Sequence, residues 1–270
     1  MTRGILTAFA ITAFAVSAAS AQIALIAKGT LTGTSAGSNA DLSGLTGPLE
    51  NGAPANLLGG LGSGIAYLDG DTFLALPDRG PNAVSFDAAI DDTVTYVNRF
   101  HTVRMHLQPS NGGTLPFTIA PELTSTTLLR SITPLAYSSG EGLGVGSGVP
   151  EINKQPFHYF TGRSDNFNPD RSTGYGGDGR FDTEGIRASN DGKEVFISDE
   201  YGPYVYQFDR STGTRTRIFR LPAKFFVENP SSQGAVEIAN SISGRVANKA
   251  WKGWRSHQMA RPFWASCKTR

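Results

Sequence analysis

Residues 183–209 read TEGIRASNDGKEVFISDEYGPYVYQFD. Short runs rich in β-branched and aromatic residues, at 186–188, 194–198 and 204–208, alternate with turn-forming residues. Asp191-Gly192 is typical of a tight hairpin turn. The segment therefore predicts a hairpin followed by a second hairpin, in which Ser211-Thr212-Gly213 leads into a strand over 216–221.

The same pattern occurs earlier in the chain. Gly64-Ile65-Ala66 precedes Asp69-Gly70, a strand over 72–76 and Asp78, as Gly185-Ile186-Arg187 precedes Asp191-Gly192, a strand and Asp199. Repeated hairpin units are typical of propeller blades, each about 40–45 residues long. The sequence predicts an all-β fold that is β-propeller-like and incomplete, with its C-terminal blades missing; a β-sandwich is the alternative.

Further strands are expected between and around the two repeats. Their predicted ranges are 23–33, 94–107, 114–119, 128–136 and 155–161. Residues 233–246 are ambiguous and fit a short helix or a loop. The 32 glycines and the low content of charged residues, 17%, also favour an all-β, loop-rich protein over a helical bundle.

The N-terminal residues have the features of an export signal. Arg3 is followed by an uncharged, mostly apolar run over 4–19, and Ala19-Ser20-Ala21 is a typical cleavage site. We expect a signal peptide over 1–21, cleavage after Ala21, and a secreted or periplasmic protein. The mature chain is predicted to contain no membrane span, because no other run of about 18 apolar residues occurs.

Residues 250–270 differ in composition from the rest of the chain. They hold all three Trp, the only Cys, five basic residues and no acidic residue. Restoring one G after the Lys249 codon permits the reading GMEGLAITPDGKTLLGIMQNA, which is a strand, a D-G turn and another strand. We therefore interpret 250–270 as an out-of-frame tail after a domain over 22–249, and we expect the truncated chain to be impaired.

The charge balance of that domain excludes one class of partner. Residues 22–249 carry 18 Lys and Arg against 23 Asp and Glu. Because nucleic-acid-binding proteins are typically basic, we expect no nucleic-acid partner. The oligomeric state is left open.

Three carboxylates are candidates for catalysis and for metal binding. Glu184 precedes one strand of the predicted hairpin, and Asp199 and Glu200 end the other, so an antiparallel pairing brings them to the same end. Clustered carboxylates can bind Ca²⁺ or supply a general acid/base pair. The alternative is that one of them accepts backbone N–H bonds between blades and the others face solvent.

A second group can bind an anionic substrate. Arg79 can hold a phosphate through two parallel hydrogen bonds, and Asp78 and Asn82 can shape its loop. Alternatively, Asp78 only braces the turn. The Asp- and Asn-rich loop over 165–182 is interpreted as turn-forming rather than Ca²⁺-binding, and Tyr201 and Tyr204 as packing residues.

Two segments resemble a known family. Residues 181–209 and the segment GGLGSGIAYLDGDTFLALPDRGPNA over 59–83 look like motifs of the Phytase-like family, whose domain is described as having esterase-like activity of phytase. The resemblance spans about 59–249. It implies a β-propeller-like fold and an exported hydrolase of phosphate or other small-molecule esters.

From the carboxylates and this resemblance together, we expect metal assistance, with Ca²⁺ as the cofactor. The alternative is a non-catalytic exported β-propeller that binds ligands or proteins and holds structural Ca²⁺.

Overall fold

The structure is a computed structural model of the 270-residue chain. It describes residues 23–33, 41–59, 61–81, 86–137, 148–202 and 204–245, together with the backbone of 254–255 and 264–265. The predicted signal peptide, Asn82 and nearly all of the predicted out-of-frame tail lie outside the described residues.

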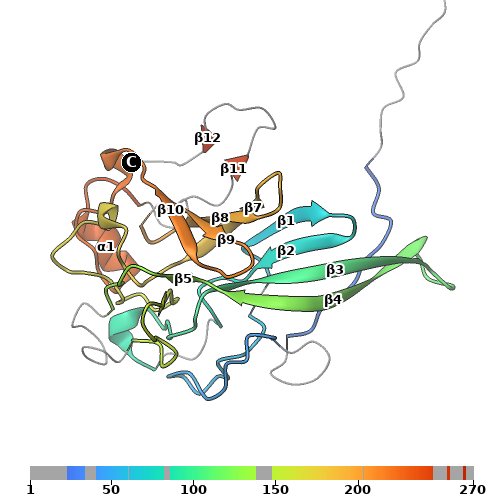
Figure 1. Ribbon diagram of the computed structural model, residues 1–270, viewed down its shortest axis with the longest axis horizontal. Coiled ribbons are helices and arrows are strands. Elements are labelled where there is room, and N and C mark those ends of the chain that lie inside the picture. Colours follow the sequence, from blue (N-terminus) through green and yellow to red (C-terminus); the bar gives the residue numbers. More distant parts are fainter. Residues whose placement is uncertain are drawn as a thin grey trace, which may run out of the picture.

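The first sheet has four antiparallel strands that follow one another in chain order. They are β1 (Gly64–Asp69), β2 (Thr72–Leu76), β3 (Arg99–Pro109) and β4 (Phe117–Leu128). The β3–β4 hairpin is about twice as long as β1 and β2 and extends well beyond them (Figure 1). Along the outer edge of β4, the backbone N–H groups of Phe117 and Ile119 donate to the carbonyls of Ile26 and Lys28, at 3.1 and 3.3 Å.

The second sheet repeats this meander. Its strands, again in chain order, are β7 (Thr183–Ala188), β8 (Glu194–Asp199), β9 (Val205–Asp209) and β10 (Arg215–Phe219). The predicted turns at Asp69-Gly70 and Asp191-Gly192 join the first two strands of each sheet.

The two sheets pack against each other through β1, β2 and β7 and share one core (Figure 1). At Gly64 a Cβ would lie 3.0 Å from the backbone N of Ile186, so the missing side chain allows the close approach. The Thr183 hydroxyl donates to the Pro77 carbonyl at 2.7 Å and ties the two sheets together at one end. The shared core contains Ala66, Leu74, Leu76, Phe100, Phe160, Phe181, Ile186, Val195, Ile197, Tyr204, Tyr206 and Phe208.

The strand register defines which positions of the two sheets correspond. Gly64 pairs with Leu76 in the first sheet, and Gly185 pairs with Ser198 in the second. Counting onward from these pairs, Asp78 corresponds to Glu200 and Arg79 to Tyr201. Counting from the glycines alone would match Asp78 with Asp199, because the second hairpin is one residue longer.

Smaller elements connect and flank the sheets. They are β5 (Arg130–Ser131), β6 (His158–Tyr159), β11 (Trp254–Arg255), β12 (Trp264–Ala265), the 3₁₀ turns η1 (Ala88–Ile90), η2 (Thr173–Tyr175) and η3 (Ala223–Phe225), and the helix α1 (Gly234–Asn240). Within the described part of the chain, no helix has the length and hydrophobicity that crossing a membrane requires.

The all-β prediction is confirmed, since strands predominate and α1 is the single α-helix of the described residues. Neither four-stranded sheet closes on itself. Several expected strands differ. Residues 23–33 form no strand of their own and instead lie along β4, and 155–161 contribute only the two-residue β6. Residues 128–136 contribute the last residue of β4 and the two-residue β5, and 114–119 contain only the beginning of β4. The ambiguous range 233–246 contains α1.

Two isoleucines at equivalent positions of the two sheets test whether the shared core stabilises the fold. Ile186 is fully buried between the sheets, whereas Ile65 is 55% exposed. Ile186→Ala should lower the free energy of unfolding by about 2–5 kcal/mol because it leaves a cavity. Ile65→Ala should cost less than about 1 kcal/mol. Urea denaturation of both variants checks this; equal losses would contradict the packing described here.

Candidate functional site

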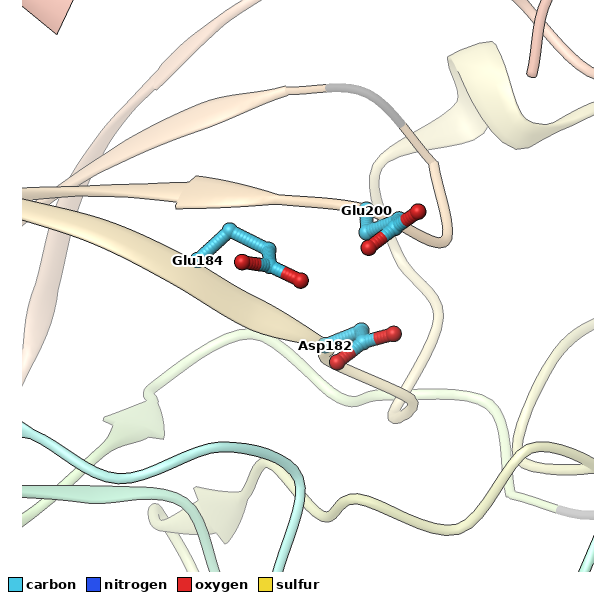
Figure 2. A group of neighbouring side chains, drawn as sticks. All are labelled: Asp182, Glu184 and Glu200. Carbon is cyan, nitrogen blue, oxygen red and sulfur yellow. The ribbon is translucent and has the colours of Figure 1, made fainter. Parts of the chain in front are cut away.

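Three buried carboxylates meet where β7 begins and β8 ends. One carboxylate oxygen each from Asp182, Glu184 and Glu200 lies within 4.8 Å of the other two (Figure 2). Asp182 directly precedes β7, Glu184 is the second residue of β7, and Glu200 directly follows β8. We call these three residues the acidic cluster.

Local backbone geometry places these side chains. The Glu200 N–H donates to the Asp182 carbonyl at 2.9 Å, which extends the β7–β8 pairing by one step beyond Thr183 and Asp199. The register shifts between Thr183 and Gly185, so Glu184 lies in a β-bulge. Bulges re-aim side chains and are common beside functional sites. Here the bulged residue contributes one of the three carboxylates (Figure 2).

Asp199 holds these strand ends together but is outside the acidic cluster. Its Oδ1 accepts the backbone N–H groups of Asp182 and Tyr201, at 2.8 and 3.2 Å, and its Oδ2 accepts that of Gly202 at 2.6 Å. Burial raises the pKa of Asp199 to about 7, although these backbone donors favour the ionised form. Its geometry is that of a brace for the two segments that carry the cluster.

Arg79 and Asp78 reach the same site from the end of β2. The Arg79 Nη1 lies 3.0 Å from Asp182 Oδ2 in an ion pair between the two sheets. Asp78 accepts the Arg79 backbone N–H at 2.6 Å. The Asp182 side chain is 3% exposed, whereas that of Arg79 is 27% exposed. Arg79 is therefore the member of this pair that solvent and ligands can reach.

Burial, neighbouring carboxyl groups and one arginine together set the electrostatics of Asp182 in the acidic cluster. Burial raises the pKa of Asp182 well above its usual range, and the nearby Asp78 and Glu200 raise it further, while Arg79 acts in the opposite direction. Arg79 therefore offsets part of the cost of ionising Asp182. A bound cation would favour the ionised carboxylates further.

The acidic cluster fits a divalent cation of the Ca²⁺ type. Ca²⁺ takes carboxylate oxygens at 2.3–2.6 Å, so oxygens bound to one ion lie up to about 5 Å apart. The separations in the cluster fall within this limit. In addition, Asp182 Oδ1 is buried and accepts no hydrogen bond from the described residues. The donors are all hard oxygens, which suit Ca²⁺ better than a thiolate- or imidazole-preferring metal.

Tyr201 follows the cluster in sequence and is enclosed by arginines. Its hydroxyl donates to the Gly162 carbonyl at 3.0 Å. Arg79, Arg180 and Arg245 lie over its ring at 5.9, 5.1 and 5.7 Å from the centroid. Burial raises the pKa of the Tyr201 hydroxyl. These contacts agree with the packing role expected from the sequence.

A cleft of about 330 Å³ lies elsewhere in the structure. It is lined by residues from 45–50, 95–97 and 149–152, and by Ala55. The Glu50 carboxylate in its wall already accepts hydrogen bonds from Thr95 and from Arg163, the latter at 3.2 Å. No residue of the acidic cluster lines this cleft.

Comparison with known proteins gives one match. The model of a family described as "Phytase-like: Esterase-like activity of phytase" covers residues 56–253, which is more than two thirds of the chain. The chain belongs to the Phytase-like family. No curated protein and no solved structure matches the sequence. The description of the Phytase-like family indicates a hydrolase, and the matched range contains both sheets and the acidic cluster.

The structure brings together most of the residues that the sequence singled out. Glu184 and Glu200 lie in the acidic cluster, and Arg79 contacts it through Asp182. Asp199 supports the cluster through backbone hydrogen bonds and contributes no oxygen to it. The catalytic, substrate-binding and metal-binding roles assigned to these residues remain predictions.

Sequence reasoning missed Asp182 because it lies in the loop interpreted as turn-forming. The available signal was its closeness in sequence to Glu184, at the start of a predicted strand.

The brace formed by Asp199 can be tested by removing its carboxylate. Asp199→Ala leaves three buried backbone N–H groups without an acceptor and should lower the free energy of unfolding by at least about 3 kcal/mol. Asp191→Ala, in the exposed β7–β8 turn, serves as the control and should cost less than about 1 kcal/mol. Urea denaturation at pH 7 measures both, and a small loss for Asp199→Ala would argue against the brace.

Asp178 should make stability depend on pH. Burial raises its pKa to about 6, partly offset by Arg180, so the folded state holds its proton up to a higher pH than the unfolded state does. Stability is therefore lost as pH rises from about 4 to about 6. At about 1.4 kcal/mol per pKa unit, this loss in the free energy of unfolding amounts to at most about 3 kcal/mol, and Asp178→Asn should remove it.

Urea denaturation of the wild type and of Asp178→Asn at pH 4 and pH 7 checks this expectation. The asparagine can still accept the Asn168 N–H, which donates to Asp178 Oδ1 at 3.0 Å, so the comparison isolates the charge. Parallel pH dependences of the two proteins would contradict it.

Proposed function

We propose that the protein is an exported, metal-assisted hydrolase of phosphate or other small-molecule esters, with its reaction centre at the acidic cluster. The single observation that carries the proposal is the convergence of Asp182, Glu184 and Glu200 within the range matched by the Phytase-like family. Such a cluster supplies hard oxygen ligands and a candidate general base in one place.

The residues of the cluster would hold the cation, proposed to be Ca²⁺. A bound divalent cation polarises an ester oxygen and lowers the pKa of bound water. Glu184 lies in β7 and Glu200 directly follows β8, so they reach the site from two neighbouring chain segments. Whichever carboxylate does not bind the ion can accept a proton from water. Asp199 supports this arrangement by fixing the backbone of Asp182.

The anionic part of the substrate is proposed to bind at Arg79. Its guanidinium is partly exposed and pairs with Asp182 of the cluster, and a guanidinium forks well onto phosphate or carboxylate oxygens. Asp78 accepts the Arg79 backbone N–H and so fixes the start of the loop. Asn82 follows in the same loop and is proposed to shape it.

We also propose a propeller-like arrangement and export through the signal peptide over 1–21. Each four-stranded sheet follows the chain order of a propeller blade, and the first strands β1 and β7 lie side by side. The reading frame restored after Lys249 would add a third copy of the motif, so the chain as it stands is proposed to have reduced activity.

Hydrolysis assays on the purified chain test the function. With Ca²⁺ present, it should hydrolyse 4-nitrophenyl phosphate or 4-nitrophenyl acetate, and a chelator should abolish the activity. Glu184→Gln and Glu200→Gln should each lower kcat/KM by about 100-fold or more, because each removes a ligand or base from the centre.

The matched control is Glu194→Gln, at the opposite end of β8 from Glu200. This variant should keep its kcat/KM within roughly twofold of the wild type. Chelator-resistant hydrolysis, or full activity of Glu184→Gln, would refute the proposal.

Burial of the cluster favours a second candidate. Asp182, Glu184 and Glu200 are 2, 8 and 4% exposed. Such burial suits a structural ion that holds strands together as well as a catalytic ion that contacts the substrate. In this alternative the protein is a non-catalytic exported propeller that binds ligands or proteins and holds structural Ca²⁺. A rise in Tm with Ca²⁺, with no hydrolysis of either ester, would select it.

A further inference from the structure

Arg79 is a cation that the fold already supplies to the acidic cluster. Its guanidinium makes one ion pair among the described residues, through Nη1 to Asp182 Oδ2 at 3.0 Å. The contact is single rather than forked, and the buried Nε has no acceptor among the described residues. Strong arginine–carboxylate pairs use two parallel hydrogen bonds, so the pair with Asp182 is weaker than a forked one. The Tyr201 ring, whose centroid lies 5.9 Å from the guanidinium carbon, is a second contact that does not involve a cluster carboxylate.

The backbone of Arg79 is fixed while its head group is accessible. A Cβ added to Gly162 would lie 1.6 Å from the Arg79 carbonyl oxygen, so the two chain segments are in tight contact. The side chain, however, is 27% exposed, compared with 3% for Asp182. A change of rotamer would take the guanidinium from Asp182 toward this open side without moving the backbone.

The repeat explains why a cation reaches this position. Arg79 corresponds in strand register to Tyr201, and Asp78 to Glu200. The ends of β2 and β8 thus deliver equivalent pairs of residues to one place between the sheets. The Tyr201 side chain is neutral and packs under the arginines, so Arg79 is the member of the two pairs that brings positive charge.

We propose that Arg79 is a built-in competitor of the metal ion. In the metal-free protein its guanidinium neutralises Asp182; when a divalent cation binds, Arg79 leaves Asp182 and becomes available to an anionic substrate. This inference rests on the metal site of the proposed function and adds to it the order of events. Metal binds first, and its binding exposes the guanidinium that binds the anion.

Calcium titration by isothermal calorimetry tests the competition without any assay of activity. Arg79→Gln removes the competing charge while keeping a polar side chain of moderate length. It should bind Ca²⁺ at least about tenfold more tightly than the wild type, because the positive guanidinium of Arg79 no longer repels the cation beside Asp182. Arg79→Lys keeps the charge and should bind Ca²⁺ with the wild-type affinity, to within roughly threefold.

Arg104→Gln is the control for loss of one positive charge. Arg104 pairs with Asp71 at the surface, beside the β1–β2 turn and at the opposite end of β2 from Arg79. Arg104→Gln should leave the Ca²⁺ affinity unchanged. Thermal unfolding gives a second readout: Arg79→Gln should have a lower Tm than the wild type without Ca²⁺ and a larger rise in Tm when Ca²⁺ is added.

Three results would overturn the competition. The first is an Arg79→Gln variant that binds Ca²⁺ as tightly as the wild type, and the second is one that binds Ca²⁺ more weakly, which would make Arg79 a support for Asp182. The third is an Arg79→Lys variant that binds Ca²⁺ as tightly as Arg79→Gln. If neither the wild type nor Arg79→Gln binds Ca²⁺, the metal site fails and the competition fails with it. If the wild type and Arg79→Gln both bind Ca²⁺ with equal affinity, the metal site stands and only the competition is refuted.

Discussion

The close packing of the two sheets is the constraint on which the rest of the structure depends. Gly64 in β1 lies against the backbone of Ile186 in β7, and the apolar faces of both sheets meet around Phe160 and Phe181. Burial of this shared core supplies the main driving force for placing the sheets together. Once they are packed in this way, the end of β2 and the β7–β8 strand ends are brought to one location, although they are far apart in sequence.

The acidic cluster is costly to build, and the surrounding structure offsets that cost. Buried carboxylates are unfavourable unless they are paired, protonated or bound to a metal. Asp182 has Arg79 on one oxygen, and Asp199 uses backbone donors to hold the segment in place. The site thus combines a rigid backbone with one accessible arginine. That combination suits a centre in which charge changes when a ligand arrives.

Local sequence signals predicted the hairpins well and predicted the site in part. The D-G turns and the alternating strands around them gave both β1–β2 and β7–β8, because these pairings are local. The same reasoning brought Glu184 and Glu200 together, since they end neighbouring strands. It could not separate Asp199 from the cluster, because the bulge at Glu184 decides which side chains converge. The contact between Arg79 and Asp182 depends on packing between sheets, which no local pattern encodes.

The segment that follows the predicted signal peptide has a consequence for solubility. Strand β4 is 12 residues long and would otherwise present a row of unpaired backbone groups along its outer edge. The carbonyls of Ile26 and Lys28 accept two of those N–H groups, so this segment shields part of the edge. Covering part of this edge with a segment of the same chain guards the folded protein against intermolecular β-pairing and aggregation.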